Sequence, residues 1–148
     1  MIIDTSAVLA ILLDERDAAI FAKAIEHAGE RRMSAAGYLE AALVIDNRGD
    51  AVAQREFDRF FQRSGITIEP VTLEQGRIAR EAYRDFGKGR HRAGLNFGDC
   101  FAYALARLLE QPLLYKGRDF GHTDLESALK PEVRTLVRAT NSRNRRSR

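Results

Sequence analysis

The chain has 148 residues, of which 45% are hydrophobic and 30% charged, a composition typical of one globular domain with a core of ordinary size. No apolar run approaches the roughly 18 to 20 residues that cross a bilayer, and the N-terminus lacks the features of a secretory leader. Its single cysteine, Cys100, excludes an internal disulfide. We therefore expect a cytoplasmic protein.

The formal net charge of +3 conceals an uneven distribution. Residues 134–148 contribute +6 and contain no acid, which leaves −3 for the rest of the chain; their arginines are Arg134, Arg138, Arg143, Arg145, Arg146 and Arg148. Such a segment is typical of a solvated tail, and it could also contact phosphates non-specifically. We predict a folded domain over 1–133 and a basic, flexible tail over 134–148.

Strand and helix patterns alternate along the domain. Strands are predicted over 1–3, 32–34, 66–71 and 112–115. A first helix is predicted over 7–13, with Thr5 or Ser6 as its N-cap, and a second helix is predicted to begin at Asp17. Further helices are predicted over 34–47, 50–63, 72–86 and 96–109. Strands separated by helices favour an α/β fold with a central parallel sheet.

Four acids in apolar surroundings are the most informative residues. Asp4 follows the first predicted strand, Asp119 follows the last, and Glu40 and Asp99 lie near the starts of helices. Ligands of parallel sheets gather at the carboxyl ends of the strands. We therefore expect these acids, distant in sequence, to converge at one edge of the sheet.

Each acid also has a simpler interpretation. Asp4 could belong to a turn, Glu40 could pair with a buried cation, and Asp99 could complete a helix cap with Asn96. Asp119 could be a loop acid, and Asp124 competes with it for the same corner of the fold. Only the joint pattern favours a functional site.

Converging carboxylates predict a site for Mg²⁺ or Mn²⁺, because these hard cations prefer oxygen ligands. No histidine or cysteine cluster has zinc spacing, and no glycine-rich phosphate loop or dinucleotide fingerprint is present. A bound divalent ion lowers the pKa of water and neutralises phosphate charge. The pattern therefore indicates phosphate chemistry.

A basic segment precedes Asp99. Lys88, Arg90 and Arg92 lie between Gly87 and Asn96, together with a second glycine and a histidine. The segment could be a mobile, solvated loop. Placed beside the acids, however, its cations would hold a polyanionic strand against the site, and we favour this RNA-binding interpretation.

Four motifs resemble, in order, those of VapC-type toxins, the PIN-domain ribonucleases of bacterial toxin–antitoxin pairs. They are Ile-Asp-Thr-Ser-Ala at the start, Tyr-Leu-Glu-Ala around Glu40, the basic segment ending in Asn-Phe-Gly-Asp-Cys, and Leu-Leu-Tyr-Lys-Gly-Arg-Asp-Phe near Asp119. The resemblance covers residues 1 to about 128, nearly the whole chain.

The resemblance implies a three-layer α/β/α PIN domain that hydrolyses RNA with Mg²⁺ or Mn²⁺. Asp4, Glu40, Asp99 and Asp119 match the catalytic, metal-binding acids of the family, with Asp124 as the alternative to the last. Thr5, Ser6 and Asn96 match polar positions that would orient the site. The implied partners are an RNA substrate, a VapB-type antitoxin that covers the site, and a second copy of the toxin.

Two other functions remain open from the residues. An aspartate-nucleophile phosphatase would use Asp4 directly, but such sites generally have a second acid where this chain has Ser6. A non-catalytic module that binds RNA or a protein partner would use the acids only structurally.

Overall fold

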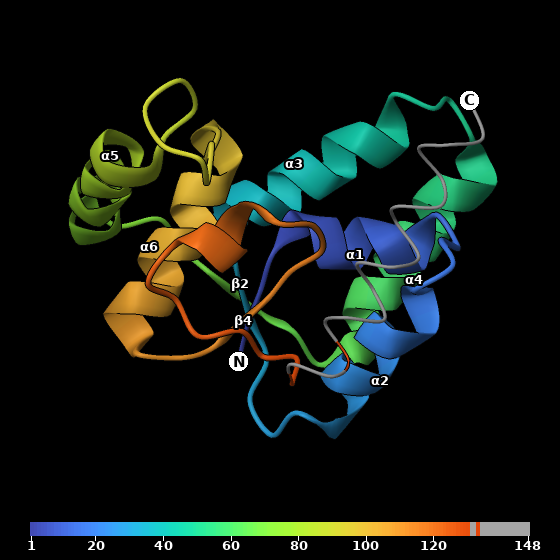
Figure 1. Cartoon of the computed structure of the whole chain (residues 1–148). Helices are drawn as coiled ribbons and strands as arrows, with labels where there is room; N and C mark the ends of the chain where they lie inside the picture. Colours follow the sequence, from blue (N-terminus) through green and yellow to red (C-terminus); the bar gives the residue numbers. More distant parts are fainter. Residues whose placement is uncertain (131–132, 134–148) are drawn as a thin grey trace, which may run out of the picture.

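The computed structural model describes residues 1–130 and Val133, and it has the predicted three-layer α/β/α architecture. Residues 134–148, the predicted tail, lie outside the described residues. In Figure 1, helices α5 (Leu73–Phe86) and α6 (Phe97–Leu109) lie on one side of the strands, and α1 (Thr5–Leu12), α2 (Ala18–His27) and α4 (Ala51–Ser64) lie on the other.

The central sheet is parallel and has the strand order β3-β2-β1-β4. Its strands are β1 (Ile2–Ile3), β2 (Arg32–Ser34), β3 (Thr67–Glu69) and β4 (Leu113–Leu114). The chain places β2 and then β3 on one side of β1, and it then returns to place β4 on the other side of β1. The strand order therefore reverses next to β1. The carboxyl ends of β1 and β4 therefore flank the crevice where such sheets bind ligands.

Successive residues of the two central strands bury against opposite layers. Ile2 and Leu113 belong to the core formed with α5 and α6, whereas Ile3 and Leu114 belong to the core formed with the helices of the other layer. All four are essentially inaccessible to solvent. Side chains of a strand alternate between its faces, so a strand that is covered on both faces requires a continuous apolar run. Burial on both faces holds β1 and β4 rigidly.

Local caps begin most helices at the predicted positions. Ser34 caps α3 (Ala35–Asp46), Asp50 caps α4, Thr72 caps α5 and Asn96 caps α6, each through a side-chain oxygen that accepts a backbone N–H. The predicted cap of the first helix was wrong. Asp4 itself caps α1, which therefore begins at Thr5 rather than Ala7.

The strand predicted over 32–34 is confirmed as β2, whereas the other three strands are shorter than predicted because the residues at their ends leave the ladder. β3 ends at Glu69, directly before Pro70, which lacks the N–H that a ladder needs. After β4 the chain forms a short 3-10 helix, η1 (Asp119–His122). Among the described residues, no helix is long and apolar enough to span a membrane.

Candidate metal centre and its surroundings

Asp4 is held at the end of β1 by hydrogen bonds from the first turn of α1. Its Oδ2 accepts the Ser6 amide at 3.0 Å and the Ser6 hydroxyl at 2.5 Å, while its own N–H donates to the Leu114 carbonyl at 2.9 Å. Burial raises the pKa of Asp4, the Ser6 hydrogen bonds oppose that shift, and the Glu40 charge adds to it. The hydrogen bonds thus fix the position of Asp4, while its surroundings disfavour the ionised form of its carboxyl group.

Glu40 approaches from the second turn of α3. The Thr5 hydroxyl donates to its Oε2 at 2.9 Å, with the Gly37 carbonyl as a second acceptor at 3.2 Å. The carboxylate lies against the backbone of Gly98, where an added Cβ would stand 2.6 Å from Oε2. A side chain at Gly98 would therefore displace the Glu40 carboxylate, so glycine at this position lets Glu40 keep its place beside α6.

Asp99 lies in the first turn of α6 and forms a capping box with Asn96. The Asn96 backbone N–H donates to Asp99 Oδ2 at 2.8 Å, and the Asp99 backbone N–H donates to Asn96 Oδ1 at 2.9 Å. Burial, followed by the charges of Asp4, Asp119 and Glu40, raises the pKa of Asp99 to about 7. The cap predicted as a simpler interpretation is present, and Asp99 faces the acid cluster as well.

The structure separates Asp119 from Asp124. Asp119, in η1, lies near enough to raise the pKa of Asp99. Asp124 instead accepts a hydrogen bond from the Tyr103 hydroxyl at 2.7 Å and lies 3.6 Å from the Arg107 guanidinium. These contacts satisfy Asp124, so the geometry favours Asp119 as the fourth acid of the site.

The donor set fits a hard divalent cation. The four carboxylates supply only oxygen, and the neighbouring acids add to the rise that burial causes in the pKa values of Asp4 and Asp99. Within the described part of the chain, no three histidine, cysteine, aspartate or glutamate side chains are arranged to hold a metal ion. The site therefore suits a hydrated Mg²⁺ or Mn²⁺ ion bound directly by one or two carboxylates, as Mg²⁺ commonly is.

A lysine that the sequence analysis missed braces the centre. The Lys116 amide donates to Ser6 Oγ at 3.0 Å, which in turn donates to Asp4. The Lys116 ammonium bonds Asp17 Oδ1 at 2.7 Å and also Glu15. Asp17 is fully buried, and its Oδ2 has no hydrogen-bond partner among the described residues. The sequence signal was a lone lysine directly after an apolar strand.

The basic segment over 87–95 is a hydrogen-bonded turn. The Lys88 backbone N–H donates to the Leu95 carbonyl at 3.0 Å. The His91 ring accepts a hydrogen bond from the Ala93 backbone N–H and packs edge-on against the Phe86 ring, with the ring centres 5.2 Å apart. Ala93 and Leu95 are buried, while Lys88, Arg90 and Arg92 are exposed. The turn therefore presents its cations from a fixed base.

Comparisons with known proteins identify the family of the chain. Residues 1–126 match the PIN domain family. Ribonuclease VapC28 of Mycobacterium tuberculosis is 54% identical over 130 residues, which cover 87% of this chain and 98% of that protein. The chain belongs to the VapC family of PIN-domain ribonucleases. A second VapC relative, Ribonuclease VapC of Mycolicibacterium smegmatis, is 50% identical over 84% of this chain and 97% of its own length.

Solved structures support the fold of this VapC protein. The crystal structure of Mycobacterium tuberculosis VapC20, a toxin that cleaves the sarcin–ricin loop, aligns with a TM-score of 0.70 over 88% of this chain and 98% of its own. A toxin–antitoxin complex from Klebsiella pneumoniae aligns with a TM-score of 0.62 over 83% of this chain and 92% of that chain. Both are 16% identical in sequence, so they bear on the fold alone.

The raised pKa of Asp99 makes stability depend on pH. In EDTA, the free energy of unfolding should fall as pH rises from about 4 to about 7, because the folded state keeps a proton that the unfolded carboxyl releases near 3.8. Chemical denaturation across this range measures the fall. Asp99→Asn should reduce it, whereas Asp58→Asn, an exposed α4 control, should not. An equal slope in Asp99→Asn would contradict the assignment.

Lys116→Met should destabilise the protein by about 3 kcal/mol or more, because it leaves the buried Asp17 carboxylate without its cation. Urea denaturation measures the loss. The exposed Lys23→Met on α2 is the matched control and should change stability by less than about 0.5 kcal/mol. Similar values for the two variants would show that Lys116 contributes little.

Proposed function

We propose that this VapC protein is a toxin that hydrolyses RNA phosphodiester bonds with Mg²⁺ or Mn²⁺. The observation that carries the proposal is the convergence of Asp4, Glu40 and Asp119 on Asp99, where burial first and then the three neighbouring charges raise the pKa of Asp99 to about 7. Its relatives VapC28 and the Mycolicibacterium smegmatis VapC, ribonucleases that are 54% and 50% identical to this chain, support the reaction class.

Asp4, Glu40, Asp99 and Asp119 are the residues that would surround the ion, one or two of them bound to it directly and the others through its water molecules. The ion supplies a water of lowered pKa and a counter-charge for the phosphate. Thr5 and Ser6 orient Glu40 and Asp4 through their hydroxyls, and Asn96 orients Asp99. The protein's own contribution is therefore preorganisation, in which the carboxylates keep their positions before the substrate arrives.

The geometry does not favour an aspartate-nucleophile phosphatase. Asp4 Oδ2 accepts two hydrogen bonds from Ser6, and the side chain is buried beneath its neighbours. The residue two positions on, which would act as the second acid, is this same serine. A purely structural role for the acids gives no reason for four carboxylates to destabilise one another.

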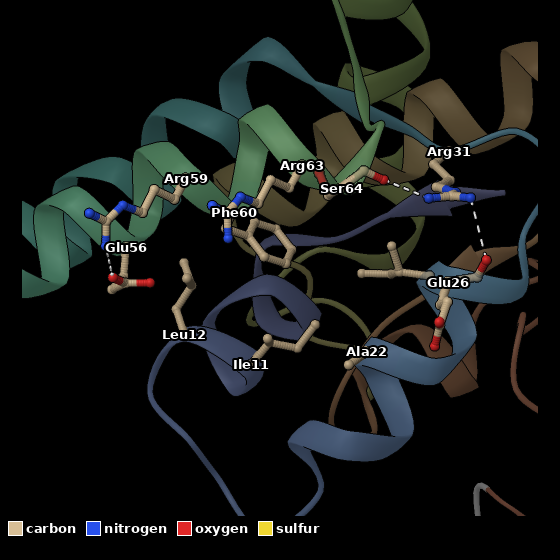
Figure 2. A pocket seen from close by; sticks show the side chains of 11 residues that line it. Ile11, Leu12, Ala22, Glu26, Arg31, Glu56, Arg59, Phe60, Arg63 and Ser64 are labelled. Carbon is tan, nitrogen blue, oxygen red and sulfur yellow. Dashed lines mark hydrogen bonds and ion pairs between the residues drawn. The ribbon is translucent and has the colours of Figure 1, made fainter.

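We also propose a VapB-type antitoxin as a partner in the cytoplasm. A groove of about 520 Å³ lies between α1, α2 and α4, with Leu12 and Phe60 on its apolar walls and Arg59 and Arg63 along one rim (Figure 2). An amphipathic segment with acidic residues suits this surface. Arg59 pairs with Glu56, while Arg63 has no ion pair among the described residues.

A homodimer is a further proposal. Leu39 and Leu43 lie one turn apart on α3, and each exposes about half of its surface. Two such side chains on one helix face form an apolar stripe that a second copy could cover.

RNA cleavage by the purified protein tests the reaction directly. Cleavage should require Mg²⁺ or Mn²⁺, stop in EDTA, and fall at least 100-fold in Asp4→Asn and Asp99→Asn, taking 10²- to 10³-fold as the order of such losses. Asp124→Asn, whose carboxylate faces Tyr103 and Arg107, is the control and should retain most activity. Metal-independent cleavage, or folded acid variants that cut normally, would refute the proposal.

Co-expression with the antitoxin tests the groove. Arg63→Glu should weaken neutralisation of growth inhibition, because it reverses the charge at the rim. Arg55→Glu, on an exposed part of α4 outside the groove, should be neutralised like the parent. Cleavage by each variant alone is measured alongside, and full neutralisation of an active Arg63→Glu variant would place the antitoxin elsewhere.

A further inference from the structure

A second hollow, of about 740 Å³, lies between α5, the basic turn and the start of α6. It is separate from the groove in Figure 2, and it lies on the side of the molecule where α5 and α6 pack together (Figure 1). Four cations line it, and no acid does: Arg80, Arg84, Lys88 and Arg90.

None of the four cations forms an ion pair within the described residues, and all four are exposed. At about 100° per residue, Arg80 and Arg84 lie about 40° apart around α5, and Glu74, Glu81 and Asp85 lie about 80° to 120° from their midpoint. None of these three acids lines the hollow. The hollow therefore carries an uncompensated positive potential that would attract a polyanion.

Aromatic rings lie among these cations. Phe97 is 79% exposed and Tyr83 is 41% exposed. The Phe97 ring packs edge-on against the Phe101 ring, with the ring centres 4.9 Å apart, and the Arg90 guanidinium lies 5.8 Å from the centre of the Tyr83 ring. A large exposed aromatic ring braced by a second ring is a platform on which a flat group can stack.

The hollow joins the acid cluster through one helix end. Asn96 lines the hollow and caps α6, and its amide donates to Asp99 Oδ2. Phe97 is the next residue, and Gly98 contacts the Glu40 carboxylate. A chain bound across the acids would therefore pass directly onto Phe97 and the cations beyond it.

We propose that this hollow binds an unpaired stretch of RNA next to the bond that is cut, with phosphates on Arg80, Arg84, Lys88 and Arg90 and a base stacked on Phe97. The proposal rests on the ribonuclease function above and defines its substrate as locally single-stranded. Stacking on a protein ring requires a base that has left its neighbours, which a continuous duplex does not offer.

Charge argues against a second copy of the chain in this place. A symmetric dimer brings the same patch of each subunit together, which would set four unpaired cations against four more. An RNA backbone instead supplies the opposite charge along its whole length.

Binding measured without cleavage tests the proposal. The full chain carrying Asp99→Asn is titrated in EDTA against a short labelled unpaired RNA and a hairpin of the same length, followed by fluorescence anisotropy over a salt series. Parallel sedimentation reports the oligomeric state. The unpaired RNA should bind more tightly than the hairpin.

In this background, Arg80→Ala with Arg84→Ala should weaken binding and reduce the salt slope by about 1.4, from roughly 0.7 per phosphate contact on a single strand. Phe97→Ala should weaken binding about 5-fold or more with an unchanged salt slope, and Phe97→Tyr should restore it. The matched control is Arg48→Ala with Arg55→Ala, two exposed arginines outside the hollow, which should bind like the parent.

Several results would overturn the proposal. They are equal binding by all variants, equal binding of the hairpin, or a change of oligomeric state in Phe97→Ala without a change in RNA affinity, which would make the hollow an interface between copies. If the parent binds no RNA, the hollow has no such role. Metal-dependent cleavage by the chain with Asp99 intact then shows separately whether the ribonuclease function stands.

Discussion

The close approach of four carboxylates, of which Asp4 is buried, is the constraint around which this VapC protein is organised. Asp4 and Asp99 both have raised pKa values, with burial as the main cause and the neighbouring acids adding to it. Placing such charges together costs stability unless a cation neutralises them. The fold provides rigid supports that keep the acids close, an arrangement whose oxygen donors would suit a divalent ion.

Those supports are local hydrogen bonds set on an immobile sheet. Ser6 holds Asp4, Thr5 holds Glu40 and Asn96 holds Asp99. β1 and β4 are buried on both faces, so the residues at their ends cannot shift. Lys116 ties the two strand ends together through Ser6 and is itself anchored on Asp17. The stability of this brace and the precision of the site are therefore coupled.

The start of α6 combines two tasks. Its cap orients Asp99, its glycine admits Glu40, and its first residue, Phe97, is displayed to solvent beside the cations of α5 and the basic turn. Negative charge is thus concentrated at the strand ends and positive charge in the neighbouring hollow. A polyanion would be drawn to the cations, and its chain would then extend toward the acids.

The sequence by itself determined the order of strands and helices, the caps at Ser34, Asp50, Thr72 and Asn96, and the acids from which a site could be built, because these depend on periodicity and on hydrogen bonds within a few residues. Tertiary structure decided the features that depend on contacts between residues far apart in the sequence. Tyr103, on α6, engages Asp124 and leaves Asp119 beside Asp99. Asp17 was expected only to begin a helix, yet its buried side chain meets Lys116, 99 residues away. The hollow exists because α5 packs on α6. No local pattern records such contacts, since they depend on how separate elements pack together.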